Sequence, residues 1–210
     1  MPLNRSLAAV VLFVWCSAMQ QSMNAQSSIK TFTAPANTFS FMYPADFRVC
    51  TSSKMEDCRG EAFIPPCDED SIVCVIYPKE KLSGTNFEGA GFQVRTVRYD
   101  PGHPNTPNEC VTPRGEQPGN NPEFLISAST PTRRVGPVRF IHGVSGGVAT
   151  GHYSFMDVYR YFHKKSCYEI TWSVSALNRG VLEDPDSIRE FNRAQVVRAF
   201  SAMLDSFRFK

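Results

Sequence analysis

The chain has almost no excess of charge of either sign and no apolar run long enough to cross a membrane. Its 22 lysines and arginines nearly balance 20 aspartates and glutamates, so it lacks the basic surface with which nucleic-acid-binding proteins neutralise phosphates. The apolar run at residues 7–15 (LAAVVLFVW) has nine residues, whereas a transmembrane helix needs about 20. We therefore expect no nucleic-acid partner and no transmembrane anchor in the mature chain.

The N-terminal region has the residue order of a secretory leader. The basic residue Arg5 precedes the apolar run at residues 7–15, and small and polar residues follow it. This order predicts a signal peptide over residues 1–25, with cleavage after Ala18 or Ala25.

A lipoprotein anchor is the alternative use of this leader, with Cys16 as the lipidated residue. The bulky Trp15 stands immediately before it, where a small residue is required, so we favour plain export into a periplasm or out of the cell. The mature chain, residues 26–210, is nearly neutral and long enough for one domain with a substantial core.

Six cysteines remain after removal of the leader, and an even number in an exported chain predicts three disulfides. Four of the six fall within 25 residues, so we expect this cluster to pair mostly within itself, which leaves Cys110 to reach Cys167. The connectivity inside the cluster stays open. The six residues are Cys50, Cys58, Cys67, Cys74, Cys110 and Cys167.

The sequence contains little that could hold a metal. No C-x-x-C motif occurs among the mature cysteines, which argues against a zinc site and against a redox-active pair. The acidic run at residues 68–70 (DED) lacks the alternating ligands and the glycine of a calcium loop, so we interpret it as a solvated acidic turn. We expect no cofactor.

Apolar residues that alternate or run together predict the strands of an antiparallel meander, because the connections between successive strands are short. In the last strand every second residue is apolar, and we predict that this face, with Tyr168, Ile170, Trp172 and Val174, belongs to the core. The expected strands cover residues 39–43, 72–77, 92–99, 138–144, 148–162 and 167–175.

Between these strands, residues 100–122 contain six prolines and three glycines, a composition that predicts a long loop without helix or strand. The chain closes with an expected helix over residues 187–206. Ser187 and Glu190 have the spacing of a capping box, and apolar residues then recur at threes and fours, Phe200 among them.

The segment GVSGG, residues 143–147, matches the G-x-S-x-G motif of a nucleophile elbow, in which a helix follows the serine. Here a strand pattern follows instead. We therefore predict that Ser145 lies in an exposed hairpin turn, in which Gly146 and Gly147 supply positive φ angles.

A serine nucleophile also needs an acid and a histidine. Asp157 and His163 follow Ser145 in the chain, but they lie on one predicted strand about 20 Å apart at the rise per residue of a strand. We expect no catalytic residue.

Two histidines flank the GVSGG segment. If the hairpin closed with a three-residue loop, His142 would lie opposite His152, at a distance that suits a shared metal. No third ligand is adjacent in the sequence, so both remain weak candidates and we expect no metal site.

Several short motifs together resemble the PsbP-like superfamily of small exported or lumenal proteins, in particular its bacterial members. They are FSFMYPADFRV, IVCVIYP, GFQVRTV, the aromatic hairpin, CYEITWSV and the ending MLDSFRF. The resemblance implies an α+β fold, an antiparallel sheet packed against the C-terminal helix as an α/β/α sandwich, here stapled by disulfides. It carries over no metal-binding residue to a position of this chain.

The resemblance further implies a non-catalytic binding or assembly module, since most members of the superfamily have such roles. The partner would be an unidentified protein or envelope component, bound through the loop at residues 100–122 or the open face of the sheet. The alternative from another class is a secreted serine hydrolase that uses Ser145.

Overall fold

The computed structural model describes residues 28–58, 66–97, 106–111 and 132–210. The expected signal peptide at residues 1–25 and most of the loop at residues 100–122 lie outside these ranges. Within them, no helix is long and apolar enough to span a membrane.

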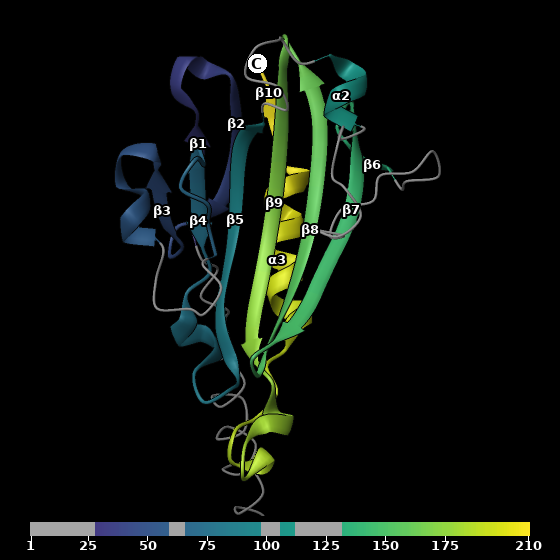
Figure 1. Cartoon of the computed structure of the whole chain (residues 1–210). Helices are drawn as coiled ribbons and strands as arrows, with labels where there is room; N and C mark the ends of the chain where they lie inside the picture. The colour runs from purple at the N-terminus through teal and green to yellow at the C-terminus, as the bar shows by residue number, and fades with distance from the viewer. Residues whose placement is uncertain (1–27, 59–65, 98–105, 112–131) are drawn as a thin grey trace, which may run out of the picture.

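A seven-stranded antiparallel sheet forms the larger part of the fold (Figure 1). The interpretation as antiparallel β-structure with a C-terminal helix is confirmed, although the sequence pattern missed the two short strands at the borders of this sheet. The predicted meander is wrong at one point, because the strand at residues 87–97 pairs with the strand at residues 166–177 and not with the next strand along the chain. In spatial order the strands are β3 (Arg48–Thr51), β4 (Val73–Ile76), β5 (Phe87–Val97), β9 (Ser166–Leu177), β8 (His152–His163), β7 (Val138–Ala149) and β6 (Thr132–Val135).

The strand predicted at residues 39–43 does not belong to this sheet. It is β2 (Phe39–Pro44), the centre of a separate three-stranded sheet with β1 (Ile29–Thr33) and β10 (Arg208–Phe209). Phe41 packs against Phe92 of the large sheet, with ring centroids 5.3 Å apart. The alternating pattern predicted a half-buried strand correctly, but burial of one face does not reveal which sheet supplies the hydrogen bonds.

The C-terminal helix α3 (Arg193–Asp205) begins six residues later than predicted, and the predicted capping box is wrong. Ser187 ends a short 3-10 turn, Pro185–Ser187, where its hydroxyl donates to the carbonyl of Asp184 at 2.6 Å. Glu190 lies before the helix and accepts hydrogen bonds from other parts of the chain. Local bonding of the polar side chains therefore outweighs the helix signal here.

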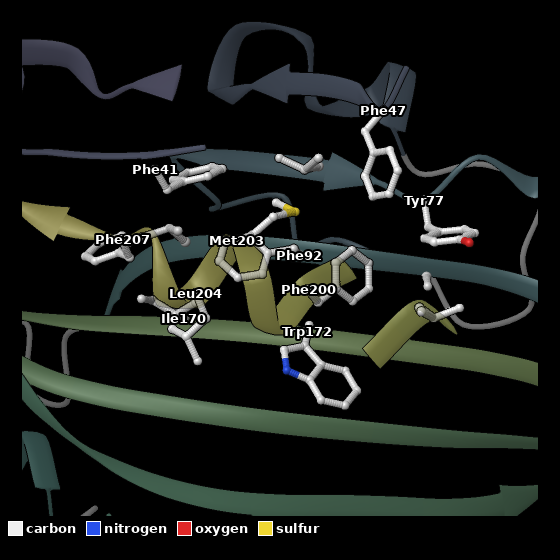
Figure 2. Packing of buried hydrophobic residues seen from close by; sticks show 14 of the residues in the cluster. Phe41, Phe47, Tyr77, Phe92, Ile170, Trp172, Phe200, Met203, Leu204 and Phe207 are labelled. Carbon is white, nitrogen blue, oxygen red and sulfur yellow. The ribbon is translucent and has the colours of Figure 1, made fainter. Parts of the chain in front are cut away.

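The core lies between α3 and the apolar face of the large sheet. Figure 2 shows Phe200 and Leu204 of α3 above Trp172 and Ile170 of β9, and the ring centroids of Trp172 and Phe200 are 6.2 Å apart. The alternate residues of β9 that the sequence assigned to the core are all buried: Tyr168, Ile170, Trp172 and Val174.

The opposite face of β9 is polar and is also buried. The carboxylate of Glu169, 3% exposed, is held between two guanidinium groups. Arg95 Nη2 lies 2.7 Å from Glu169 Oε1, and Arg160 Nε lies 2.6 Å from Oε2. Charge-assisted bonds to both oxygens compensate for the loss of water around this carboxylate.

The acidic segment at residues 68–70 lies against this polar layer. Arg95 Nη1 is 2.9 Å from Asp68 Oδ2 and 3.4 Å from Asp70 Oδ1, while both carboxylates stay half exposed. Gln93 Nε2 donates to Asp68 Oδ2, and Gln93 Oε1 accepts from the backbone N–H of Asp68. The segment is therefore bound to Arg95 and Gln93, and the interpretation as a merely solvated turn is corrected.

The predicted loop at residues 100–122 contains a short helix, α2 (Pro107–Val111), which the proline count wrongly excluded. Pro107 occupies the first helical position, where its missing N–H costs no hydrogen bond. In Figure 1, α2 and α3 lie on opposite sides of the sheet. The α/β/α sandwich remains a prediction, because α2 is one turn long.

The six mature cysteines lie in three pairs at disulfide distance. The Cα atoms are 6.0 Å apart in Cys50–Cys58, 6.0 Å in Cys67–Cys74 and 5.3 Å in Cys110–Cys167. Separations of this size match those of disulfides, so the geometry is compatible with oxidation of all three pairs.

If the chain is exported as its leader predicts, the mature protein should contain no free thiol, because an oxidising compartment converts such pairs into disulfides. Titration of the denatured, unreduced protein with a thiol reagent measures this directly. Reduced and denatured protein serves as the control and should give six thiols. Two or more thiols in the unreduced sample would contradict the prediction.

A candidate binding groove at the hairpin end of the sheet

Strands β7 and β8 are joined by a two-residue turn, Thr150–Gly151. Both residues have positive φ, 47° and 81°, as a type I′ hairpin turn requires. The pairing runs without interruption from Ala149↔His152 to Ile141↔Arg160.

The prediction that Ser145 lies in the turn is therefore wrong. Ser145, Gly146 and Gly147 are inside β7, and neither of these glycines has positive φ among the described residues. The pair that forms the turn, Thr150–Gly151, lies four residues further on. The dipeptides that mark a type I′ turn in a sequence are Asn-Gly, Asp-Gly and Gly-Gly, so Thr150–Gly151 carries no strong local signal of its position.

Successive side chains of a strand point to opposite faces of its sheet. Ser145 pairs with Met156, whereas His142 pairs with Tyr159, so the side chains of Ser145 and His142 lie on opposite faces. His142 instead contacts Asp157, with Nε2 2.6 Å from Oδ1. The structure thus brings together a histidine and an acid on one face and leaves Ser145 on the other.

A fluorophosphonate probe is expected to leave Ser145 unlabelled, because no described histidine reaches its hydroxyl to act as a base. Mass spectrometry of the probe-treated protein measures this. A known serine hydrolase treated in parallel is the positive control. Labelling of Ser145 that heat denaturation abolishes would restore the hydrolase interpretation.

The expectation that His142 faces His152 is also wrong, because the turn lies further along the chain than assumed. The residue opposite His142 is Tyr159, seven positions from His152 along β8, or about 23 Å at ~3.3 Å per residue. His152 contacts a different acid, with Nδ1 2.8 Å from Glu88 Oε1. Among the described residues no group of three potential ligands could hold a metal ion.

An open groove of about 780 Å³ lies at the hairpin end of the sheet. Both Gly146 and Gly147 of β7 belong to its lining, and Gly146 lies on the same face of the strand as Val148. The remaining lining comes from β7 and β8, from the segment after β9 and from the segment that enters α3: Val148, Tyr153, Ser154, Phe155, Asn178, Arg179, Glu190, Phe191 and Arg193.

The buried side chain of Asn86 connects the elements around the groove. Its Nδ2 donates to the carbonyl of Leu177 at 2.8 Å and to Tyr153 Oη at 3.0 Å. Its Oδ1 accepts from the N–H of Phe191 at 2.9 Å. One amide thus fixes β8, the end of β9 and the segment before α3 relative to one another, so the groove is preformed.

The hydroxyl of Tyr153 donates to the carboxylate of Glu190, and both residues line the groove. Burial, followed by this hydrogen bond, raises the pKa of Tyr153 from 10.0 to about 12. At neutral pH the phenol therefore acts as a hydrogen-bond donor that fixes Glu190.

The raised pKa of Tyr153 predicts part of the alkaline destabilisation of the protein. The unfolded state releases this proton first, so the stability contributed by the phenol is complete below pH ~10 and is lost as pH approaches ~12. We expect the urea midpoint of Tyr153→Phe to fall less than that of the wild type between pH ~9 and ~11. Equal decreases for the two proteins would contradict this assignment.

The surface of the groove is apolar and carries a cation. Val148 in its lining is 71% exposed, and Val144, which lies beside the groove on the same face of β7, is 68% exposed. The guanidinium of Arg193 lies 3.7 Å from the centroid of the Phe155 ring, a favourable cation–π position. Among the described residues no carboxylate forms an ion pair with Arg193.

No protein-family model matches the chain, and no curated protein matches it. Similar solved structures include a protein of Bacteroides thetaiotaomicron (TM-score 0.47, 10% identity), for which the match covers 86% of this chain and 48% of that protein. This chain thus spans about half the length of the Bacteroides protein.

Two further solved structures cover the chain more fully. LpqN of Mycobacterium tuberculosis, involved in cell envelope biogenesis, has a TM-score of 0.42 and 9% identity over 87% of this chain and 91% of that one. PsbP of the cyanobacterium Synechocystis has a TM-score of 0.38 and 10% identity over 91% and 99%. At such low similarity, membership of the PsbP-like superfamily remains a prediction.

Proposed function

We propose that the protein is an exported, non-catalytic module that binds a protein partner at the groove of the β7–β8 hairpin. The observation that carries this proposal is the preformed groove, which is lined by the exposed Val148 and the cation of Arg193, with the exposed Val144 beside it on the same face of β7. Exposed apolar surface next to a few fixed polar groups is typical of binding sites.

The bonding of the polar groups in the groove supports binding rather than catalysis. Tyr153 and Glu190 are hydrogen-bonded to each other, and Asn86 is bonded to both. These bonds fix the shape of the groove and occupy the atoms that would otherwise be available to move a proton. The alternative, a hydrolase that uses Ser145, lacks support because that side chain and His142 lie on opposite faces of β7.

Export is supported by the leader-like order of residues 1–25 and by the three cysteine pairs at disulfide distance. Disulfides persist in periplasmic and extracellular compartments and are rare in the cytosol. The partner would then be another exported protein or a protein of the envelope.

Site-specific photo-crosslinking in the producing cells tests the proposed site. A photoreactive amino acid at Val148 should give one discrete adduct, while the same residue at Met42, which is also exposed but lies on the small sheet, should give none. Excess purified wild-type protein should abolish the adduct, and excess Val144→Asp protein should not. The proposal is abandoned if positions 148 and 42 give the same pattern or if wild-type protein does not compete.

A further inference from the structure

Among the residues that the structure describes, only one half of the outer edge of β7 is paired with another strand. β6 pairs with residues 138–141, and no strand of the described residues pairs with the remainder of β7 on that side. Figure 1 shows β7 at the border of the sheet, with β6 beside one part of it. The unpaired stretch, residues 142–149, is called the free edge below.

The hairpin turn determines which backbone groups of the free edge are unpaired. In a two-residue hairpin the residues that flank the turn, here Ala149 and His152, exchange hydrogen bonds with each other. Every second residue from Ala149 therefore bonds to β8, and the intervening residues direct their N–H and C=O groups outward. The outward-facing residues are His142, Val144, Gly146 and Val148.

We propose that a strand of another polypeptide adds to the free edge and extends the seven-stranded sheet. This inference rests on the proposed function and specifies how the partner binds. Strand addition combines main-chain hydrogen bonds with pockets for alternate side chains. The side chains of Val144 and Val148 lie on the face of the sheet that carries the groove, so every second side chain of the added strand would enter it.

The free edge lacks the features with which proteins usually block unwanted strand pairing. Residues 142–149 contain no lysine, no proline and no acidic residue, and the register with β8 shows no bulge. Natural edge strands are commonly protected by such features, since an open edge otherwise pairs with other chains. An unprotected edge beside a preformed groove is therefore suited to a specific partner.

Charge complementarity indicates the chemistry of the partner strand. Arg193 has no carboxylate partner among the described residues, so an acidic side chain entering the groove would complete an ion pair there. A second copy of this chain is less suited, because residues 142–149 contain no acidic residue to offer Arg193. The favoured occupant is an extended segment with alternating apolar residues and one aspartate or glutamate.

Peptide selection tests this inference. The library contains random peptides of about eight residues, because the free edge is that long at one residue per strand position. The bait is the mature wild-type protein, and Val144→Pro is the counter-selection bait. Proline removes the outward N–H of residue 144 and is tolerated where an edge N–H faces solvent. Val144→Ile, which keeps both the N–H and an apolar β-branched side chain, is the matched control.

We expect selected peptides to alternate apolar residues around one acidic residue. Their affinity should fall about tenfold or more for Val144→Pro, stay within about twofold for Val144→Ile, and fall several-fold for Arg193→Gln. Hydrogen exchange of the complex should show new protection at the amides of residues 144, 146 and 148. The amides of 143, 145 and 147 should be protected already in the free protein and in Val144→Pro, which verifies that the hairpin is intact.

Strand addition is rejected if no peptide is enriched over the Val144→Pro bait, or if the new protection does not alternate. It is also rejected if sedimentation shows a dimer that Val144→Pro dissociates, because the occupant is then a second copy. One outcome would remove only the strand mechanism and leave the proposed function in place. In that outcome wild-type protein abolishes the crosslink at Val148, and Val144→Pro binds the partner normally.

Discussion

Replacing Phe200 with alanine is expected to lower the free energy of unfolding by about 3–5 kcal/mol, the cost of removing a large aromatic side chain from a packed core. Phe200 has no exposed surface. Its ring centroid lies 6.2 Å from those of Phe92 and Trp172 and 6.3 Å from that of Tyr77. The substitution thus leaves a cavity where α3 meets the large sheet.

Urea denaturation of the two proteins measures this difference. Val148→Ala is the matched control, because Val148 is 71% exposed and its truncation should change stability little. A loss for Phe200→Ala no larger than that for Val148→Ala would mean that the helical face has been assigned wrongly.

Glu169→Gln is expected to destabilise the protein by about 3–5 kcal/mol, because it removes the buried negative charge that lies between the guanidinium groups of Arg95 and Arg160. The side chain of Arg160 is only 8% exposed, so water cannot replace the lost carboxylate. The variant keeps the size of the side chain, which separates the effect of charge from that of packing.

Asp186→Asn provides the comparison at the surface. Asp186 pairs with Arg179 at 3.0 Å, but its side chain is 98% exposed, and exposed ion pairs contribute little to stability. Thermal unfolding of the two variants under the same conditions should show a large decrease for Glu169→Gln and almost none for Asp186→Asn. Equal decreases in Tm for the two variants would mean that burial does not determine how much the Glu169 ion pairs contribute to stability.

The sequence predicted those parts of the fold in which one face of an element is buried in a single core. Period-two alternation located β2 and the core face of β9, and period 3.6 located the buried face of α3 around Phe200. These apolar periods depend only on the local sequence and on which face is buried, so they predict an element without any knowledge of the tertiary structure. The start of α3 was wrong because Ser187 and Asp184 bond to each other locally.

Strand register and the position of the groove could not be predicted from such local patterns. A shift of the hairpin turn by a few residues changes every cross-strand pair, and the expected pairing of His142 with His152 failed for this reason. The groove depends on Asn86, Tyr153 and Glu190, which are distant in the sequence and meet through side-chain hydrogen bonds. Nothing in their local sequence distinguishes them from ordinary polar residues.

The cysteine pairs follow one another along the chain: the first mature cysteine pairs with the second, the third with the fourth and the fifth with the sixth. A chain that crosses a membrane N-terminus first presents its cysteines to an oxidase in that same order. Oxidation of each cysteine with the next one to emerge would therefore yield these pairs directly. The protein should mature in a cell that lacks a disulfide isomerase, provided that it retains a thiol oxidase.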